Sequence, residues 1–231
     1  MSDRKLVIVF ALFPGVTQLD FTGPHQVFSR LPDASVILAS ATGDPVEVDG
    51  MIFAGLRRLA DIPGCDVICV PGGRGITDSV IHDSAFLGEV RRLAATARFV
   101  TSVCTGSLAL GAAGLLRGRR AASHWGLRDT LALFGAIPDA GRVVRDGNIV
   151  TGGGVTAGID FALTLVAEIA GPETAQAIQL QIEYAPAPPF DAGLPESAPP
   201  AILARVRAQN AASATQRRQA IEAAAARLPP A

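Results

Sequence analysis

The sequence has no excess of charge of either sign and few residues of the kinds that hold metals. Its 20 Lys and Arg residues nearly balance 21 Asp and Glu residues, for a formal net charge of −1. This balance gives no electrostatic reason to expect nucleic acid or an anionic membrane as a partner, so we expect a small neutral molecule instead. None of the three histidines is spaced from another histidine or from a carboxylate residue in the way that metal ligands are. We therefore expect no metal site.

Long apolar runs and paired cysteines are also lacking. The apolar run Leu6–Leu12 is too short to span a bilayer and shows no small-residue cleavage pattern, so we expect a first buried strand there. The cysteines Cys65, Cys69 and Cys104 form an odd set without the spacing of a zinc site. We expect reduced thiols and hence a cytoplasmic protein that does not insert into membranes.

Val- and Ile-rich segments alternate with segments of helical pattern in the first half of the chain. The expected strands are Leu6–Phe10, Ser35–Ala39, Asp66–Val70 and Arg98–Val103, and the expected helices are Gly23–Leu31, Ala85–Ala97 and Thr105–Leu115. This alternation predicts a flavodoxin-like α/β fold, with a doubly wound, mostly parallel sheet and helices on both faces. The dipeptides Asp49-Gly50 and Asp146-Gly147 predict two short hairpins.

The composition changes after Tyr184 to Ala, Pro and Arg. We expect an α/β domain over residues 1–184 and an extension of the same domain over 185–231. The extension begins as a proline-rich arm and continues as one or two alanine-rich helices within Ala201–Leu228. Such an arm docks on the body, reaches a second subunit or stays in solvent, and the sequence leaves these alternatives open.

Cys104 lies where a β-branched segment meets a segment of small residues. The pattern Ser102-x-Cys104-x-Gly106 is close to the nucleophile elbow G-x-S-x-G, in which a sharp strand-to-helix turn presents the nucleophile. The N-terminus of the following helix would favour a thiolate, which is the nucleophilic form. The pattern predicts a cysteine nucleophile. The alternative is a buried strand cysteine that acts as a small hydrophobic residue.

Asp20 follows the first predicted strand and has the apolar neighbours Leu19 and Phe21. Ligands of open α/β sheets bind at the carboxyl edge of the strands, where Cys104 is also expected. Partial burial there would raise the pKa of the carboxyl, so Asp20 is a candidate proton donor at neutral pH. The alternative is an N-cap for a helix that begins near Pro24.

Three further positions are expected near the same edge. Gly72 and Gly73 end the third predicted strand and offer backbone N–H groups to a developing negative charge, or else they form only a tight turn. Thr105 adds a hydroxyl and an N–H group beside Cys104. His124 is the only plausible imidazole partner for the thiol, with a purely structural histidine as the alternative.

Taken together and in order, these motifs resemble the ThiJ/PfpI superfamily. The resemblance is carried by Asp20-Phe-Thr-Gly23-Pro24, Pro71-Gly72-Gly73, Cys104-Thr105-Gly106, His124-Trp125 and the glycine-rich run from Gly152 to Asp160. The segment Ile182–Phe190 is similar to the branch that hydrates isonitriles. The resemblance implies a homodimeric hydro-lyase that needs no cofactor and turns an isonitrile and water into a formamide.

The same resemblance implies a role for each site residue. Cys104 would form a covalent thioimidate, Asp20 would supply and take up protons, and Thr105 and Gly73 would orient water or stabilise charge. Other functions on this fold stay open: a cysteine redox or stress sensor, another thiol hydrolase, or a ligand-binding regulator. Thr105 replaces the His of protease-like members, and Asp20 replaces the Glu of the stress-sensor branch.

Overall fold

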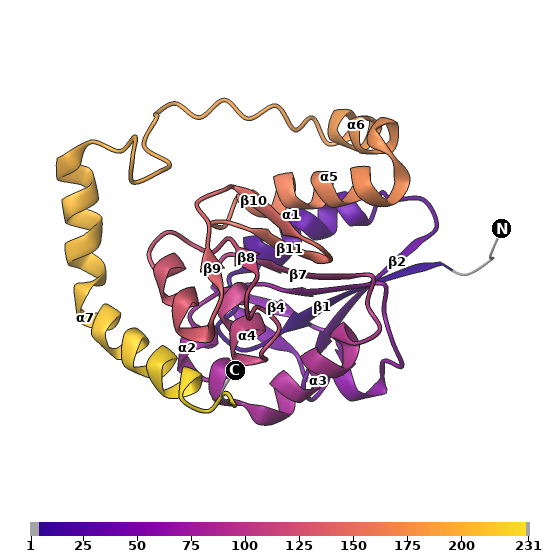
Figure 1. Cartoon of the computed structure of the whole chain (residues 1–231). Coiled ribbons are helices and arrows are strands. Elements are labelled where there is room, and N and C mark those ends of the chain that lie inside the picture. The colour runs from indigo at the N-terminus through magenta and orange to yellow at the C-terminus, as the bar shows by residue number, and fades with distance from the viewer. Residues whose placement is uncertain (1–4, 230–231) are drawn as a thin grey trace.

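A seven-stranded sheet forms the centre of the molecule, and this computed structural model describes residues 5–229 (Figure 1). The strands lie in the order β10-β11-β7-β6-β1-β2-β5, and all neighbours are parallel except β10 and β11. This order confirms the doubly wound sheet. In chain order the strands are β1 (Leu6–Leu12), β2 (Ala34–Ser40), β5 (Arg57–Arg58), β6 (Val67–Val70), β7 (Phe99–Val103), β10 (Val143–Asp146) and β11 (Ile149–Gly152).

Helices cover both faces of the sheet, as predicted (Figure 1). On one face of the sheet, α5 packs against both α1 and α6. On the other face, α3 and α4 pack against β6, and α4 also packs against β7. These helices are α1 (Gln18–Phe28), α3 (Ser84–Ala94), α4 (Gly106–Ala112), α5 (Ala157–Ala170) and α6 (Pro172–Gln181). Strands β6, β7 and β11 are buried along their whole length, which explains why none of them carries a charged residue.

Several helix boundaries differ from the prediction: α1 and α3 end three residues before the expected Leu31 and Ala97, and the start of α1 and the end of α4 differ as well. Helix α1 begins before the expected Gly23, so Pro24 lies inside the helix and Asp20 lies in its first turn. Burial of Phe21 and Phe28 on this helix stabilises it despite the proline. Helix α4 ends before the expected Leu115, because the chain turns at a glycine with a φ of 76° two residues after the helix.

Short elements connect the main ones. Both predicted Asp-Gly hairpins are present, one between β3 and β4 and one between β10 and β11. The remaining strands are β3 (Val46–Val48), β4 (Met51–Phe53), β8 (Arg120–Ala121) and β9 (Ile137–Pro138). A short helix α2 (Gly75–Asp78) follows β6, and 3-10 turns lie at η1 (Leu59–Asp61), η2 (Val80–His82) and η3 (Arg128–Phe134).

The C-terminal extension folds back onto its own body. Its alanine-rich part is a single helix, α7 (Pro200–Ala225), whose later turns pack against α2, α4, η2 and η3. Ile221 and Ala224 are buried in this contact. The linker over 182–199 arches away from the body before it reaches α7 (Figure 1), and the Phe190 side chain on it is 80% exposed. Within this single chain, the later turns of α7 thus dock on the body; whether the extension also reaches a second subunit stays a prediction.

No helix within residues 5–229 is long and apolar enough to cross a membrane.

Candidate active site

Cys104 occupies a sharp turn between β7 and α4, as the elbow pattern predicts. Its backbone is left-handed, with a φ of 58°, a conformation that residues other than glycine seldom adopt. The Cys104 N–H donates to the carbonyl oxygens of Gly153 at 2.8 Å and Gly152 at 3.1 Å. The hydroxyls of Ser107 and Ser123 donate to the Cys104 carbonyl oxygen at 3.2 and 3.1 Å. These bonds hold the strained turn from both sides.

Gly106 lets the elbow lie directly against the neighbouring strand. A Cβ at this position would collide with the carbonyl oxygen of Val70, the last residue of β6. The glycine of the elbow pattern is therefore required for close packing of two backbones.

Asp20 reaches the elbow because the loops after β1 and β6 are bonded to each other. Thr17 N–H donates to Gly72 O at 2.8 Å, and Val16 and Gly73 form an isolated antiparallel bridge. The Gly72 N–H in turn donates to Asp20 Oδ2 at 2.8 Å. The carboxyl is completely buried, and its other oxygen, Oδ1, accepts no hydrogen bond from the described residues. The N-cap alternative is wrong, because Thr17 occupies the N-cap position of α1.

The Asp20 carboxyl and the Cys104 thiol lie against each other, and each shifts the pKa of the other. Burial raises the pKa of Asp20 to about 7, although the bonds from Gly72 and Cys104 oppose this shift. The direction of this shift agrees with the one expected for Asp20, whose role as a proton donor stays a prediction. Burial, followed by the nearby Asp20 charge, also raises the pKa of Cys104 far above its usual range, against a smaller opposing contribution from the Thr105 N–H.

Burial opposes the thiolate that the N-terminus of α4 was expected to favour. Cys104 is only 5% exposed, and loss of hydration disfavours the charged sulfur. The site thus favours a neutral thiol beside a carboxyl whose pKa is raised to about 7.

The two expected oxyanion donors are already bonded to side chains of the site. Gly73 N–H donates to Thr105 Oγ1 at 3.0 Å, and Gly72 N–H donates to Asp20. A Cβ on Gly72 would lie 2.5 Å from Thr105 N and 2.7 Å from Asp20 Oδ2. These glycines therefore position Asp20 and Thr105, and the expectation that the Gly73 N–H stabilises charge on a ligand is wrong for this arrangement.

A cavity of about 180 Å³ opens over the thiol. Cys104, Thr105, Gly73 and His124 line it, so the structure brings four of the six predicted site residues to one surface, with Asp20 and Gly72 bonded just beneath. His124 Nδ1 accepts a hydrogen bond from Gly126 N–H at 3.2 Å. Burial and the nearby Arg217 charge lower the pKa of His124, so its ring is neutral.

Sequence reasoning did not anticipate several other residues of this cavity. Arg74 directly precedes α2, Thr77 lies in α2, and Arg217 lies in α7. Thr17, Leu127 and Val155 complete the lining. The only sequence signal for Arg217 is its place in an alanine-rich helix, which does not indicate where that helix docks. Within the described chain, no cluster of three or more His, Cys, Asp or Glu residues is arranged to hold a metal ion.

The fold and the site define a doubly wound α/β protein with a cysteine at a strand-to-helix elbow and a buried carboxyl beside it. The chain belongs to the DJ-1/PfpI family, whose model matches residues 5–168. This membership confirms the resemblance seen in the sequence.

Individual relatives extend the match beyond residue 168. Isonitrile hydratase of Pseudomonas putida is 53% identical over 224 residues, which cover 96% of this chain and 98% of that protein. The crystal structure of a ThiJ/PfpI family protein from Pseudomonas syringae superposes with a TM-score of 0.90 at 39% identity, over 96% of this chain and 90% of that one. Drosophila melanogaster DJ-1beta, at a TM-score of 0.69 and 23% identity, covers 79% of this chain and all of its own and shares the fold.

Proposed function

We propose that this protein is a lyase that hydrates isonitriles, R–N≡C, to N-substituted formamides. The observation that carries the proposal is the buried pair of Cys104 and Asp20 beneath a small cavity. The similarity to isonitrile hydratase of Pseudomonas putida, which extends over nearly both whole chains, supports the same substrate class. A nucleophilic sulfur suits the terminal carbon of an isonitrile, and the cavity volume suits a small molecule.

In the first step, Cys104 Sγ forms a bond to the terminal carbon. Because the thiol is neutral at rest, its proton passes to the Asp20 carboxylate as the sulfur attacks. The attacked carbon becomes electron-rich and takes this proton from Asp20. The product is a thioimidate, R–N=CH–S–Cys104, and Asp20 is again a carboxylate.

In the second step, Asp20 takes a proton from water while the oxygen attacks the thioimidate carbon. Asp20 then gives this proton to the nitrogen, so the intermediate is R–NH–CH(OH)–S–Cys104 and Asp20 is again a carboxylate. Collapse of this intermediate breaks the C–S bond, and the hydroxyl proton returns through Asp20 to the sulfur. The formamide R–NH–CHO leaves, and the overall reaction consumes one isonitrile and one water without a cofactor.

Thr105 assists as a positioning group in this proposal. Its N–H lies at the sulfur and opposes the rise in the Cys104 pKa, and its hydroxyl is held by Gly73 at the cavity wall. His124 lines the cavity as a neutral ring and contacts the substrate, without a required proton transfer.

Trapping the intermediate tests this function. Mass spectrometry of the enzyme mixed with cyclohexyl isonitrile is expected to show the added mass on the peptide that contains Cys104, with formamide in solution. Cys104→Ala is expected to lose both signals. The matched control, Cys65→Ala, removes another buried thiol outside the site and is expected to keep both. Turnover by Cys104→Ala would overturn the mechanism.

The same experiment separates a hydratase from a redox sensor. A sensor would show no formamide and would instead accumulate oxidised Cys104 with peroxide. The raised pKa of the thiol opposes both rapid oxidation and unassisted nucleophilic attack, because the thiolate is the reactive form in each. The products therefore decide between the two functions.

We further infer a homodimer that works in the cytoplasm without nucleic-acid or membrane partners. Apolar side chains on α6 and the linker are strongly exposed in the single chain, at Leu180, Phe190 and Leu194. Such exposure is typical of a surface that a second copy covers. The three cysteines are free thiols, which fits a reducing compartment. Light scattering is expected to give twice the chain mass of 23.8 kDa.

A further inference from the structure

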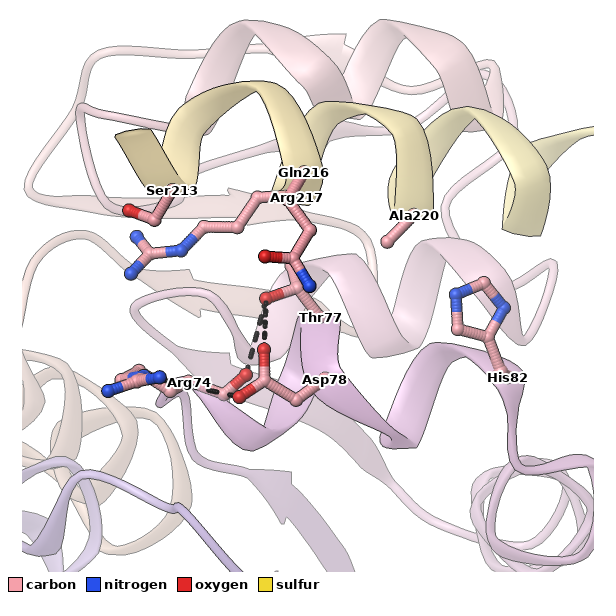
Figure 2. Close-up of a pocket in the computed structure, with 8 residues that line it drawn as sticks. All are labelled: Arg74, Thr77, Asp78, His82, Ser213, Gln216, Arg217 and Ala220. Carbon is pink, nitrogen blue, oxygen red and sulfur yellow. Dashed lines mark hydrogen bonds and ion pairs between the residues drawn. The ribbon is translucent and has the colours of Figure 1, made fainter. Parts of the chain in front are cut away.

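A second cavity, of about 280 Å³, lies between α2 and the later turns of α7 (Figure 2). Arg74, Thr77 and Asp78 line its lower side in this view, and Gln216 and Arg217 line its upper side. Three of its residues, Arg74, Thr77 and Arg217, also line the cavity over Cys104. The two cavities therefore meet at a shared wall.

The charge at this shared wall is positive and only partly compensated. Arg74 lies 4.0 Å from Asp78, in a pair that is mostly exposed. Arg217 is half-buried and forms no ion pair with any residue from 5 to 229, whereas its neighbour Arg218 is paired with Glu222. A half-buried guanidinium without a counter-charge favours an anionic ligand.

Besides these two arginines, the Asp78 carboxylate and Ala220, the larger cavity is lined by polar, uncharged groups. His82 lines it with a buried Nδ1 atom that has no hydrogen-bond partner among the described residues. Burial and the Arg227 charge lower the pKa of His82, so the ring is neutral. Gln216 adds an amide, and Figure 2 shows its side chain directed toward α2. The wall thus offers hydrogen-bonding groups around one free cation.

We infer that the substrates include isonitriles whose R group carries a carboxylate, and that Arg217 is the specificity-determining residue that binds it. This inference rests on the proposed function. The guanidinium matches a carboxylate with two parallel hydrogen bonds, and it lies on the wall of the cavity that contains the nucleophile. The isonitrile carbon reaches Cys104 while the chain between the two groups extends toward the larger cavity.

A matched substrate series tests this inference. The probes are short ω-isocyanoalkanoates and their methyl esters, which differ in charge but little in shape. For the wild-type enzyme, kcat/KM is expected to be about 10- to 100-fold higher for the carboxylate, the range for a charge-assisted hydrogen bond. Arg217→Gln is expected to remove most of this ratio, and Arg217→Lys, which keeps the charge but loses the planar geometry, to keep part of it.

Arg207→Gln is the control, because it removes an exposed positive charge from the same helix. It is expected to keep the wild-type ratio. Equal kcat/KM values for carboxylate and ester in the wild type, or an unchanged ratio in Arg217→Gln, would overturn the inference while the hydratase function stands. If neither probe is hydrated, the inference fails, and the proposed function fails with it only if cyclohexyl isonitrile also gives no formamide and no adduct on Cys104.

Discussion

At the residue scale, the Asp20 carboxyl and the Cys104 thiol share protons as a coupled pair. Both pKa values are raised, mainly because both groups are buried. The apparent pKa of about 7 therefore belongs to the first deprotonation of the pair, which produces one proton on two groups. In the form with one proton, the Asp20 carboxylate can accept the proton of the thiol. In the form with two protons, Asp20 is already protonated and cannot act as a base.

The pH dependence of turnover follows from this count of protons. We expect kcat/KM with a neutral isonitrile to rise with pH, by up to about tenfold per unit below pH 7, and to level off above it. Asp20→Asn is expected to abolish this inflection and to lower kcat/KM by about 10²- to 10⁴-fold, since the amide accepts no proton from the thiol. A flat wild-type profile between pH 5 and pH 8 would contradict the assignment of Asp20 as the base.

The same carboxyl lowers the stability of the folded protein at neutral pH. Its folded pKa of about 7 lies above its ordinary value of 3.8, so between these values the native state binds a proton that the unfolded state has lost. The free energy of unfolding therefore falls as pH rises through this window, by up to about 4 kcal/mol from this group.

Asp20→Asn removes this penalty. At pH 8 we expect the free energy of unfolding, measured by urea titration, to be about 1–4 kcal/mol higher for the variant than for the wild type. At pH 4, where the wild-type carboxyl is neutral, we expect the two free energies to differ little. Asp78→Asn serves as the control, because this carboxylate on α2 is more than half exposed. We expect it to have little effect on the difference in the free energy of unfolding between pH 8 and pH 4. Equal stabilisation at both pH values would show that titration of Asp20 is not the cause.

At the scale of elements, the turn after β6 positions the whole site. Its Gly72 N–H binds Asp20 and its Gly73 N–H binds Thr105, while its backbone also bonds the loop after β1. The placement of Asp20 beside Cys104 therefore depends on contacts among three separate strand ends, those of β1, β6 and β7.

Gly72→Ala tests this arrangement. The added methyl would meet Thr105 N and Asp20 Oδ2 well inside normal contact distance, so both residues must move. We expect a loss of at least about tenfold in kcat and a decrease of about 1–3 kcal/mol in the free energy of unfolding. Gly64→Ala, before the opposite end of β6, meets only Thr96 Oγ1 at 3.5 Å and is expected to leave kcat unchanged. Wild-type kcat in Gly72→Ala would show that the close approach is not needed.

At the scale of the whole molecule, the later turns of α7 line both cavities of the body. Ile221 is fully buried in this contact, and Arg217 lies one turn earlier on the same helix. The packing of α7 therefore fixes the position of Arg217 at the cavity over Cys104, although both residues lie more than a hundred positions after Cys104 in the chain.

Ile221→Ala measures this link. We expect a loss of about 2–5 kcal/mol in urea unfolding, because a buried methyl-rich side chain is removed and a cavity remains. A rise in KM for isonitriles is expected to accompany it, since α7 docks less firmly. Ile202→Ala, at an exposed position on the first turn of the same helix, is expected to cost about 1 kcal/mol or less and to leave KM unchanged. Equal effects of the two variants would contradict the docked arrangement.

The predictable parts of the protein are those governed by local pattern. Continuous Val and Ile runs predicted the four central strands, and the Asp-Gly pairs predicted both hairpins, because backbone preferences and strand burial act over a few residues. The start of α1 was misplaced because Pro24 is a strong local signal, and packing of the helix on the sheet outweighs it.

The sequence by itself determined the alternation of strands and helices and the elbow at Cys104, since these depend on residue type and close neighbours. Only the tertiary structure decided that burial raises the pKa values of Asp20 and Cys104, that Gly72 and Gly73 hold side chains of the site, and that Arg217 reaches the cavity. The physical reason is distance along the chain. Desolvation and the docking of α7 are set by residues that lie far apart in sequence, and no local pattern contains them.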